Sequence, residues 1–301
     1  MADNSGAKLV PTPWRLEVVR RSRWLPVIWF IRLKPLGAFG GFLLLIVGLL
    51  ALTAPLLTPY DPTEAVPAQR LLPPSNTHLL GTDAFGRDVF SRVIYGARVS
   101  LFVGFLATVI TTAGATVIGL ATGYWGGILD DLFQRLVDGV MALPFLILVL
   151  TVMMLIGNTV TNLGTVFGVI YAIRNSRVVR SVALGIKEEQ YIDAARAVGC
   201  GPWRILGRHV LPNIVGPLMV VATVTWGIAI LAESQVSFLG YGVPPPLPSW
   251  GRMVSSDGRQ FLESAPWIAA FPGLAISIVV FGFNMFGDAL RDVLDPRMRR
   301  G

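Results

Sequence analysis

One acidic side chain, Glu233, stands at the end of an apolar run and is the residue whose position most strongly suggests a chemical role. A carboxyl group at or within the edge of a membrane must be hydrated, paired or protonated, so it is a functional candidate by default. The alternative is an acid near a helix end that is satisfied locally by Ser234, Gln235 or water. We therefore take Glu233 as a candidate functional residue and keep the local role open.

The other residue types that do chemistry are scarce. Cys200 is the only cysteine, and the only histidines are His78 and His209, so there is no intrachain disulfide and we expect no metal site. The sequence contains no HExxH and no Gly-x-Ser-x-Gly pattern, which argues against the usual hydrolases. It also lacks a Gly-x4-Gly-Lys-Ser/Thr loop, so we expect no ATP bound in the P-loop manner and no enzymatic activity in this chain.

The composition is that of an integral membrane protein. Of the 301 residues 53% are hydrophobic and only 14% are charged, with a mean hydropathy of +0.63. The net charge of +7 does not indicate nucleic-acid binding, because the basic residues gather beside the apolar runs, as charges that set membrane topology do.

Six apolar runs predict an all-α bundle of six membrane-spanning helices, since about 20 residues cross about 30 Å of hydrocarbon. The fourth is the weakest, because Arg174 and Arg177 interrupt it unless they reach to the interface. Pro144, Pro217 and Pro272 lie within spans and predict kinks. The predicted spans are residues 38–57, 98–124, 139–157, 163–183, 214–232 and 267–286.

The distribution of Lys and Arg predicts that both termini are cytoplasmic. Residues 1–35 and 174–212 carry seven basic residues each, against three in 58–97 and two in 233–266. The loop 126–138 does not fit this charge distribution, because it should be cytoplasmic yet carries three Asp and one Arg. Acidic residues, however, contribute little to orientation. We thus divide the chain into a basic cytoplasmic or interfacial leader, 1–35, and a membrane domain, 36–301.

The second span carries small side chains at every fourth position, which lets helix backbones approach closely. This ridge packs either inside the chain or against a partner subunit. Its members are Ala107, Thr111, Ala115, Gly119 and Gly123.

Residues 188–212 form a polar, basic insertion between spans. The spacing predicts a helix whose apolar side holds Tyr191, Ala194, Ala195 and Val198, an interruption at 199–202, and a second short helix. The apolar members of this second helix are Trp203, Ile205, Leu206 and Val210, and Pro212 then begins a span.

Two further segments lie between spans. In 78–101, Thr82 or Asp83 is predicted to cap a helix with an apolar face. The apolar residues of that helix are Val89, Phe90, Val93, Ile94 and Ala97. In 232–253, four prolines between Val243 and Ser249 exclude a helix there and predict an extended or turning path.

The order Asp193, Ala194, Ala195, Gly199, then Leu211 and Pro212 resembles the EAA signature of bacterial ABC-importer permeases. Asp193 stands where many members have Glu, and His209 where the consensus has Ile. The resemblance implies that residues 186–212 form a cytoplasmic coupling loop whose short helix inserts into a cleft of an ATPase subunit. The coupling residues would be Asp193, Ala194, Ala195, Gly199, Gly201, Trp203, Arg204, Ile205, Leu206, Arg208, Leu211 and Pro212.

The segments 78–101 and 232–253, together with the closing run FPGLAISIVVFGFNMFGDALRDVLDPRMR, resemble the dipeptide, oligopeptide, glutathione and nickel branch of these permeases. The similarity runs from about residue 36 to the end. It implies the six-helix type I importer bundle in a bacterial inner membrane, one subunit of a heterodimer with a second, homologous permease. Two ATPase subunits would bind the ATP and Mg, and an external solute-binding protein would deliver the substrate.

The resemblance favours peptides as substrate, with nickel complexes, glutathione or opines as alternatives. Glu233, Ser234 and Ser237 are then the candidates for lining the substrate path, and 78–101 either helps dock the binding protein or simply folds onto the bundle. An ion-coupled secondary transporter is the less favoured class, because the centres of the spans lack buried ionisable groups and no repeat is evident. An intramembrane enzyme lacks any recognisable catalytic set.

Overall fold

The computed structural model describes residues 30–294 and, within them, is helical without a strand. The basic leader up to residue 29 and the tail arginines Arg297, Arg299 and Arg300 lie outside the described residues. The α-helices are α2 (Pro35–Leu52), α3 (Ala54–Leu57), α4 (Val89–Trp125), α5 (Gly127–Ala142), α6 (Phe145–Ile156), α7 (Val160–Lys187), α8 (Gln190–Ala197), α9 (Pro202–Ile205), α10 (Leu211–Phe238), α11 (Trp250–Arg252) and α12 (Trp267–Leu294). Shorter turns are η1 (Pro67–Gln69), η2 (Leu206–Val210) and η3 (Met253–Gly258).

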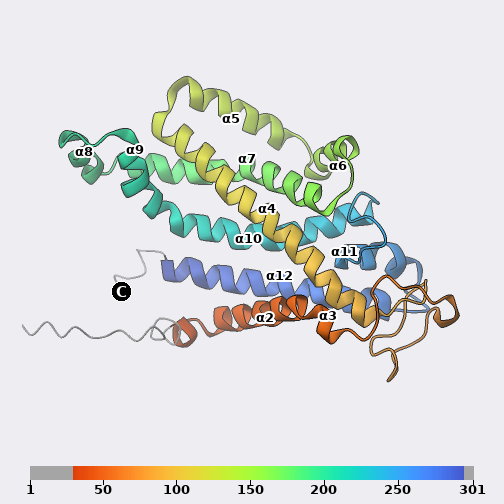
Figure 1. Ribbon diagram of the computed structural model, residues 1–301. Coiled ribbons are helices and arrows are strands. Elements are labelled where there is room, and N and C mark those ends of the chain that lie inside the picture. The colour runs from red at the N-terminus through yellow and green to blue at the C-terminus, as the bar shows by residue number, and fades with distance from the viewer. Residues whose placement is uncertain (1–29, 295–301) are drawn as a thin grey trace, which may run out of the picture.

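The long helices lie side by side and give the bundle two distinct ends (Figure 1). We call the end with residues 58–88 and 239–266 the loop end, and the end with residues 188–210 the elbow end. The start of α2 and the end of α12 meet at the elbow end, where Lys34 Nζ lies 2.5 Å from Asp292 Oδ2. Both ends of the described chain are therefore on the same side as the elbow.

The prediction of an all-α membrane bundle is confirmed, and the lengths of the spans are refined. By length and composition α2, α4, α12 and the continuous stretch Pro202–Phe238 can cross a membrane, and α5 with α6 makes a fifth candidate as a bent pair. The remaining helix, α7, contains the predicted fourth span and is 28 residues long, with Arg174, Arg177 and Arg180 in its second half. These arginines are why its apolar run looked short.

Two predicted spans are broken. The first, 38–57, is divided at Thr53 into α2 and α3. The third, 139–157, starts inside α5 and is bent by 96° between α5 and α6. Pro144 lies at this bend and precedes α6, so the predicted kink is confirmed as a full break. With 12 residues, α6 is only about 18 Å long and cannot cross the hydrocarbon alone.

The acidic segment 126–138 was predicted to be a loop. In the structure it forms most of helix α5. Asp130 of α5 accepts a hydrogen bond from Arg180 Nε of α7 at 2.6 Å, and Arg177 pairs with Asp138. Gln134, one turn from both acids, accepts from Arg177 Nε at 3.0 Å. Two of the three acids that conflicted with the charge pattern, Asp130 and Asp138, are thus paired with arginines of α7, a tertiary contact that a count of loop charges misses.

The small-residue ridge of α4 packs inside the chain, against α7. A Cβ placed on Gly119 would come within 2.6 Å of Val179 Cβ, and one on Gly123 within 2.9 Å of Ala183 Cβ. Thr111 Oγ1 donates across the same contact to the Gly168 carbonyl at 3.2 Å. Of the two alternatives for the ridge, the internal one holds, and this close approach fixes α4 and α7 together.

Candidate functional site

The elbow is a helical hairpin, α8 and α9, joined by a tight turn. The α8 helix ends with a Schellman arrangement, in which Cys200 N–H donates to the Ala195 carbonyl at 3.0 Å and Gly199 N–H to the Arg196 carbonyl at 2.9 Å. Gly199 has a φ of +83°, a left-handed conformation that a residue without Cβ adopts at no steric cost. The predicted interruption at 199–202 is therefore a defined turn.

The second elbow helix is continuous with the span that follows, where we expected a separate helix. Residues Pro202–Phe238 form one stretch of 37 residues through α9, η2 and α10. Pro212, which has no backbone N–H to donate, lies in the first turn of α10 directly after the π-helical turn η2. Any movement of α9 is thus applied directly to a membrane-spanning helix.

The inner face of the elbow is apolar and packs on the ends of α4 and α7. Ile192, Ala195, Ile205, Leu206 and Val210 form one cluster with residues of both helices. Tyr191 and Val198, predicted to share this face, are instead 44% and 79% exposed. The reason is the shortness of α8, whose eight residues bury a single stripe at an i, i+3 spacing, Ile192 and Ala195.

The outer face of the elbow exposes a large aromatic side chain. Trp203 is 77% exposed, although its ring meets Trp125 edge-on at a centroid distance of 5.3 Å. Asp193 pairs with Arg196 at 2.9 Å on the surface of α8, and partial burial together with the Glu189 carboxylate raises the pKa of the Tyr191 phenol, which stays neutral. Of the residues named for coupling, those at the surface are Asp193, Ala194, Gly199, Gly201, Trp203, Arg204, Arg208, Leu211 and Pro212, and those buried are Ala195, Ile205 and Leu206.

At the loop end, Glu233 of α10 is fully buried and hydrogen-bonded by hydroxyl groups. Ser237 Oγ and Ser249 Oγ donate to its Oε1 at 2.7 and 2.8 Å, and Ser100 Oγ to its Oε2 at 3.4 Å. A backbone hydrogen bond from Gly251 completes the set. The carboxyl group is satisfied by the protein itself, through partners other than the Ser234 and Gln235 we had considered.

The three candidates for lining a substrate path separate in the structure. Glu233 and Ser237 are closed off by the chain's own atoms. Ser234, which is partly exposed, lines a cavity of about 370 Å³ whose remaining wall is Gln235, Phe238, Leu239 and, from α6, Leu146. In this conformation Ser234 alone can reach a molecule in the cavity.

A tryptophan that sequence reasoning missed fills the crevice between α4 and α10. Trp250 is 1% exposed, and its indole Nε1 donates to the Val93 carbonyl at 2.9 Å. Its backbone N–H faces Ser100 Oγ at 3.3 Å. The prolines between 243 and 249 do turn the chain back to the bundle, as predicted, and Trp250 is the side chain that anchors this return.

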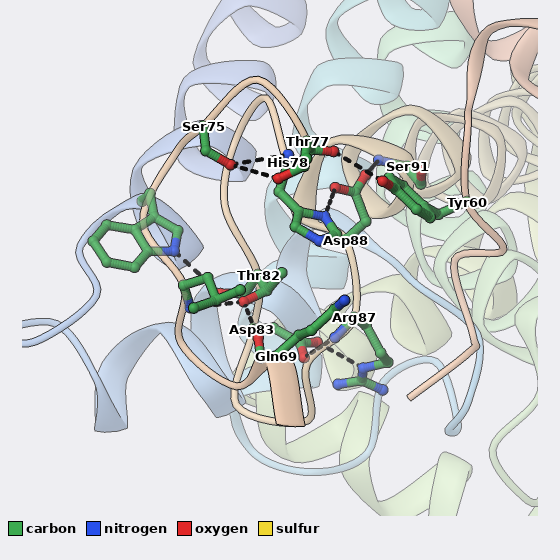
Figure 2. Close-up of polar contacts among 12 residues, drawn as sticks. Tyr60, Gln69, Ser75, Thr77, His78, Thr82, Asp83, Arg87, Asp88 and Ser91 are labelled. Carbon is green, nitrogen blue, oxygen red and sulfur yellow. Dashed lines mark hydrogen bonds and ion pairs between the residues drawn. The ribbon is translucent and has the colours of Figure 1, made fainter. Parts of the chain in front are cut away.

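The segment before α4 folds onto the loop end through buried ion pairs (Figure 2). His78 Nδ1 lies 2.9 Å from Asp88 Oδ1, and Asp88 Oδ2 accepts from Ser91 N–H at 2.8 Å, so Asp88 caps α4. Asp83 pairs with Arg87 at 2.6 Å and with Arg92 at 3.4 Å.

The predicted cap at Thr82 or Asp83 is therefore wrong by several residues. Thr82 Oγ1 instead donates to the Gln69 carbonyl at 2.5 Å, and Trp267 Nε1 donates to the Thr82 carbonyl at 3.1 Å. These residues bind the loop to itself and to α12, and α4 begins only at Val89. The predicted apolar face of its first turns is confirmed, with Val89, Ile94 and Ala97 buried. Within residues 30–294 no three His, Cys, Asp or Glu side chains converge on a point that could hold a metal ion.

The chain is similar in sequence to known families and to known membrane proteins. Residues 115–300 match the family of binding-protein-dependent transport system inner membrane components, and residues 22–74 match the N-terminal membrane domain of oligopeptide transport permease C. A dipeptide transport system permease protein of Alkalihalophilus pseudofirmus is 41% identical over 92% of this chain and 91% of its own. A glutathione transport system permease protein of Pectobacterium atrosepticum is 37% identical over 97% and 94%.

The fold has a solved counterpart. A chain of the inward-facing MetNI methionine ABC transporter aligns with a TM-score of 0.53 at 19% identity, covering 68% of this chain and 97% of that one. This likeness concerns the fold alone. On the two matched domains and the extent of the sequence identity, the chain belongs to the family of inner-membrane permease components of binding-protein-dependent transport systems, in its oligopeptide permease C branch.

Proposed function

We propose that this chain is one permease subunit of an ATP-driven importer that carries di- or oligopeptides across the bacterial inner membrane. The observation that carries the proposal is the elbow: an exposed hairpin with Trp203 at its surface, continuous with a membrane-spanning helix. The choice of peptides rests on the relatives, because a dipeptide permease matches this chain over 92% of its length. In this proposal the subunit has no nucleotide site of its own, so it needs a contact such as this elbow to receive the force that ATP hydrolysis generates in the partner ATPases.

In this proposal the elbow end and both termini face the cytosol. The seven basic residues of 174–212 support this orientation, and the pairing of Asp130 and Asp138 with arginines of α7 removes the one conflicting loop. A second, homologous permease completes a heterodimer, two ATPase subunits bind ATP and Mg and contact the elbow, and an external solute-binding protein docks at the loop end. This chain itself holds no cofactor.

Reconstitution of the whole complex tests the proposal. In proteoliposomes with the partner permease, the ATPases and the binding protein, we expect peptide uptake that requires ATP. Trp203→Asp places a charge where an apolar contact is needed and should reduce ATP-driven uptake by about a hundredfold, since central aromatic residues dominate interface energies. Leu262→Asp, at a 57% exposed position of the loop end outside the predicted spans, is the matched control and should leave the ATPases bound.

Two outcomes would reject the proposal. One is uptake at the normal rate with Trp203→Asp, which would remove the coupling role of the elbow. The other is uptake by this chain alone under an ion gradient, which would place it among secondary transporters.

Glutathione is the second candidate substrate. The glutathione permease relative covers 97% of this chain at 37% identity, which lies within the range of the peptide permeases. Competition of unlabelled dipeptides, oligopeptides and glutathione against one labelled peptide in the same proteoliposomes distinguishes the two substrates.

A further inference from the structure

The buried Glu233 is explained neither by the elbow nor by the cavity beside Ser234. Its hydrogen-bond partners come from three separate parts of the chain: Ser100 on α4, Ser237 on α10 itself, and Ser249 before α11. A carboxyl group that collects hydroxyl donors from several elements joins them, because losing it would leave each of these donors buried and unpaired. Glu233 is therefore a joint between helices at the loop end.

The joint is closely packed as well as hydrogen-bonded. A Cβ on Gly251 would fall 2.4 Å from Ser234 Cα and 2.9 Å from Glu233 Oε2, so the backbone of 249–251 lies directly on α10. On the α4 side, a Cβ on Gly96 would come within 3.2 Å of the Trp250 ring. Such interlocked packing has no room to slide, and the end of α10 moves only together with α4.

The outer face of the opposite end of the same helical stretch is exposed, although its inner face packs on α4 and α7. Trp203 on α9 is 77% exposed. Between the two ends lie the π-helical turn η2 and Pro217, the kinds of feature at which helices bend. A helical stretch that is fixed at one end and can bend before the other end responds to force on α9 by moving its elbow-side part relative to the fixed end.

We propose that Glu233 is the fixed pivot of α10, a positioning residue that holds this helix against α4 and residues 249–251 throughout the transport cycle. Force applied at α9 then bends the stretch at η2 and Pro217 relative to this fixed end, while Glu233 itself does not contact substrate. The inference rests on the proposed function, because the pivot has a role only if the elbow is driven.

Substitution of Glu233 separates coupling from folding. In proteoliposomes of the complete complex, Glu233→Ala should lower the peptide transported per ATP hydrolysed by about tenfold, within the range of coupling between distant sites, with ATP hydrolysis changed by no more than about twofold. Glu233→Gln keeps the oxygen that accepts from Ser237 and Ser249, so it should restore most of the uptake. Glu263→Ala removes an exposed carboxyl group at the same end and is the control. An equal fall in hydrolysis and uptake, or an unchanged ratio, would overturn the inference.

A crosslink tests the fixed nature of the joint without relying on the Ala variant. Ser100→Cys and Ser249→Cys are combined in a Cys200→Ala background, and uptake is compared before and after oxidation of the same sample. A pivot that never opens predicts uptake by the crosslinked protein at least equal to that of the reduced protein. Loss of uptake on oxidation, recovered on reduction, would show that the joint must open and would disprove the proposal. If the disulfide does not form, the ratio of peptide transported to ATP hydrolysed, measured with Glu233→Ala, is the only test of the pivot.

Failure of the inference is distinguishable from failure of the proposed function. The wild-type complex is measured first, and the complex with Cys200→Ala and Glu233 intact second. If the wild type shows no ATP-dependent peptide uptake, the proposed function fails; if both transport and the crosslink stops uptake, only the pivot fails.

Discussion

The loop end and the elbow end of the bundle are held together by different means. At the loop end buried polar groups bridge separate elements, as Asp88 does with His78 and Glu233 with Ser249. At the elbow end the inner face is apolar, the ion pairs are at the surface, and Trp203 is exposed. The first end is built to keep one shape by itself, whereas the second leaves apolar area that a partner must cover. Substitutions at the loop end should therefore lower stability, and those on the outer face of the elbow should lower uptake.

The largest effect is expected at Trp250. Trp250→Ala empties the crevice between α4 and α10 and leaves the Val93 carbonyl without its donor, so it should destabilise the protein by about 3 to 5 kcal/mol. Thermal unfolding of the purified complex in detergent measures this. Trp250→Phe keeps a smaller aromatic ring in the crevice and loses the hydrogen bond, so it should cost less than Trp250→Ala, about 1 to 3 kcal/mol. Equal melting temperatures for the wild type and Trp250→Ala would contradict the view that the loop end is locked.

The elbow should show the opposite response. Gly199→Val puts a β-branched side chain at a φ of +83°, which displaces α9 from α8 at a local cost of about 1 to 3 kcal/mol. We expect ATP-driven uptake to fall by about a hundredfold, the rate equivalent of about 2.7 kcal/mol, while the protein still reaches the membrane. Gly185→Ala, at an exposed glycine of α7 with open space around it, is the matched control. Normal uptake with Gly199→Val would mean that the turn does not set the position of α9.

Asp88 provides an intermediate case at the loop end. Asp88→Ala removes the cap of α4 and the partner of His78 together, so it should cost about 1 to 3 kcal/mol. Asp88→Asn keeps an oxygen for the Ser91 N–H and should recover part of this stability. Thermal unfolding of both variants and of the control Glu64→Ala, at an exposed acid of the same segment, gives the comparison. A loss no larger than that of Glu64→Ala would show that the segment is not held by this pair.

The same contrast explains what the sequence could predict. The elbow was found because its signature, Asp193 to Pro212, is contiguous and its apolar positions recur at a helical spacing. The joint at Glu233 could not be found in this way, because its donors, Ser100 and Ser249, are far apart in the chain and neither serine lies in a recognisable motif. No local pattern marks residues that meet only after the helices have packed.

Element boundaries failed for a related reason. Hydropathy locates the part of a helix that is in hydrocarbon, so it placed the start of the second span at residue 98, whereas the helix predicted in 78–101 and this span are one helix that begins at Val89. It also treated 126–138 as a loop, because the acids of α5 are favourable only when Arg177 and Arg180 are beside them. Composition predicts six spans, whereas by length and composition the described residues hold four, or five if the bent pair α5 and α6 is one span; where each helix begins and ends follows from tertiary contacts.

The smallest effect is expected at the surface ion pair of α8, where Asp193 Oδ1 lies 2.9 Å from Arg196 Nη1. Exposed pairs of this kind contribute about 0 to 1 kcal/mol, so Arg196→Ala should leave the melting temperature of the complex nearly unchanged. Asp193→Ala should be equally mild for stability, but if the elbow binds an ATPase it should lower uptake, because the carboxylate then faces the partner. The two variants are compared in one uptake assay and one unfolding assay. The comparison separates the contribution of the ion pair to stability from the contribution of the Asp193 carboxylate to binding an ATPase. If Arg196→Ala and Asp193→Ala behave alike in both assays, the pair is a surface contact and the outer face of α8 is not part of the docking surface.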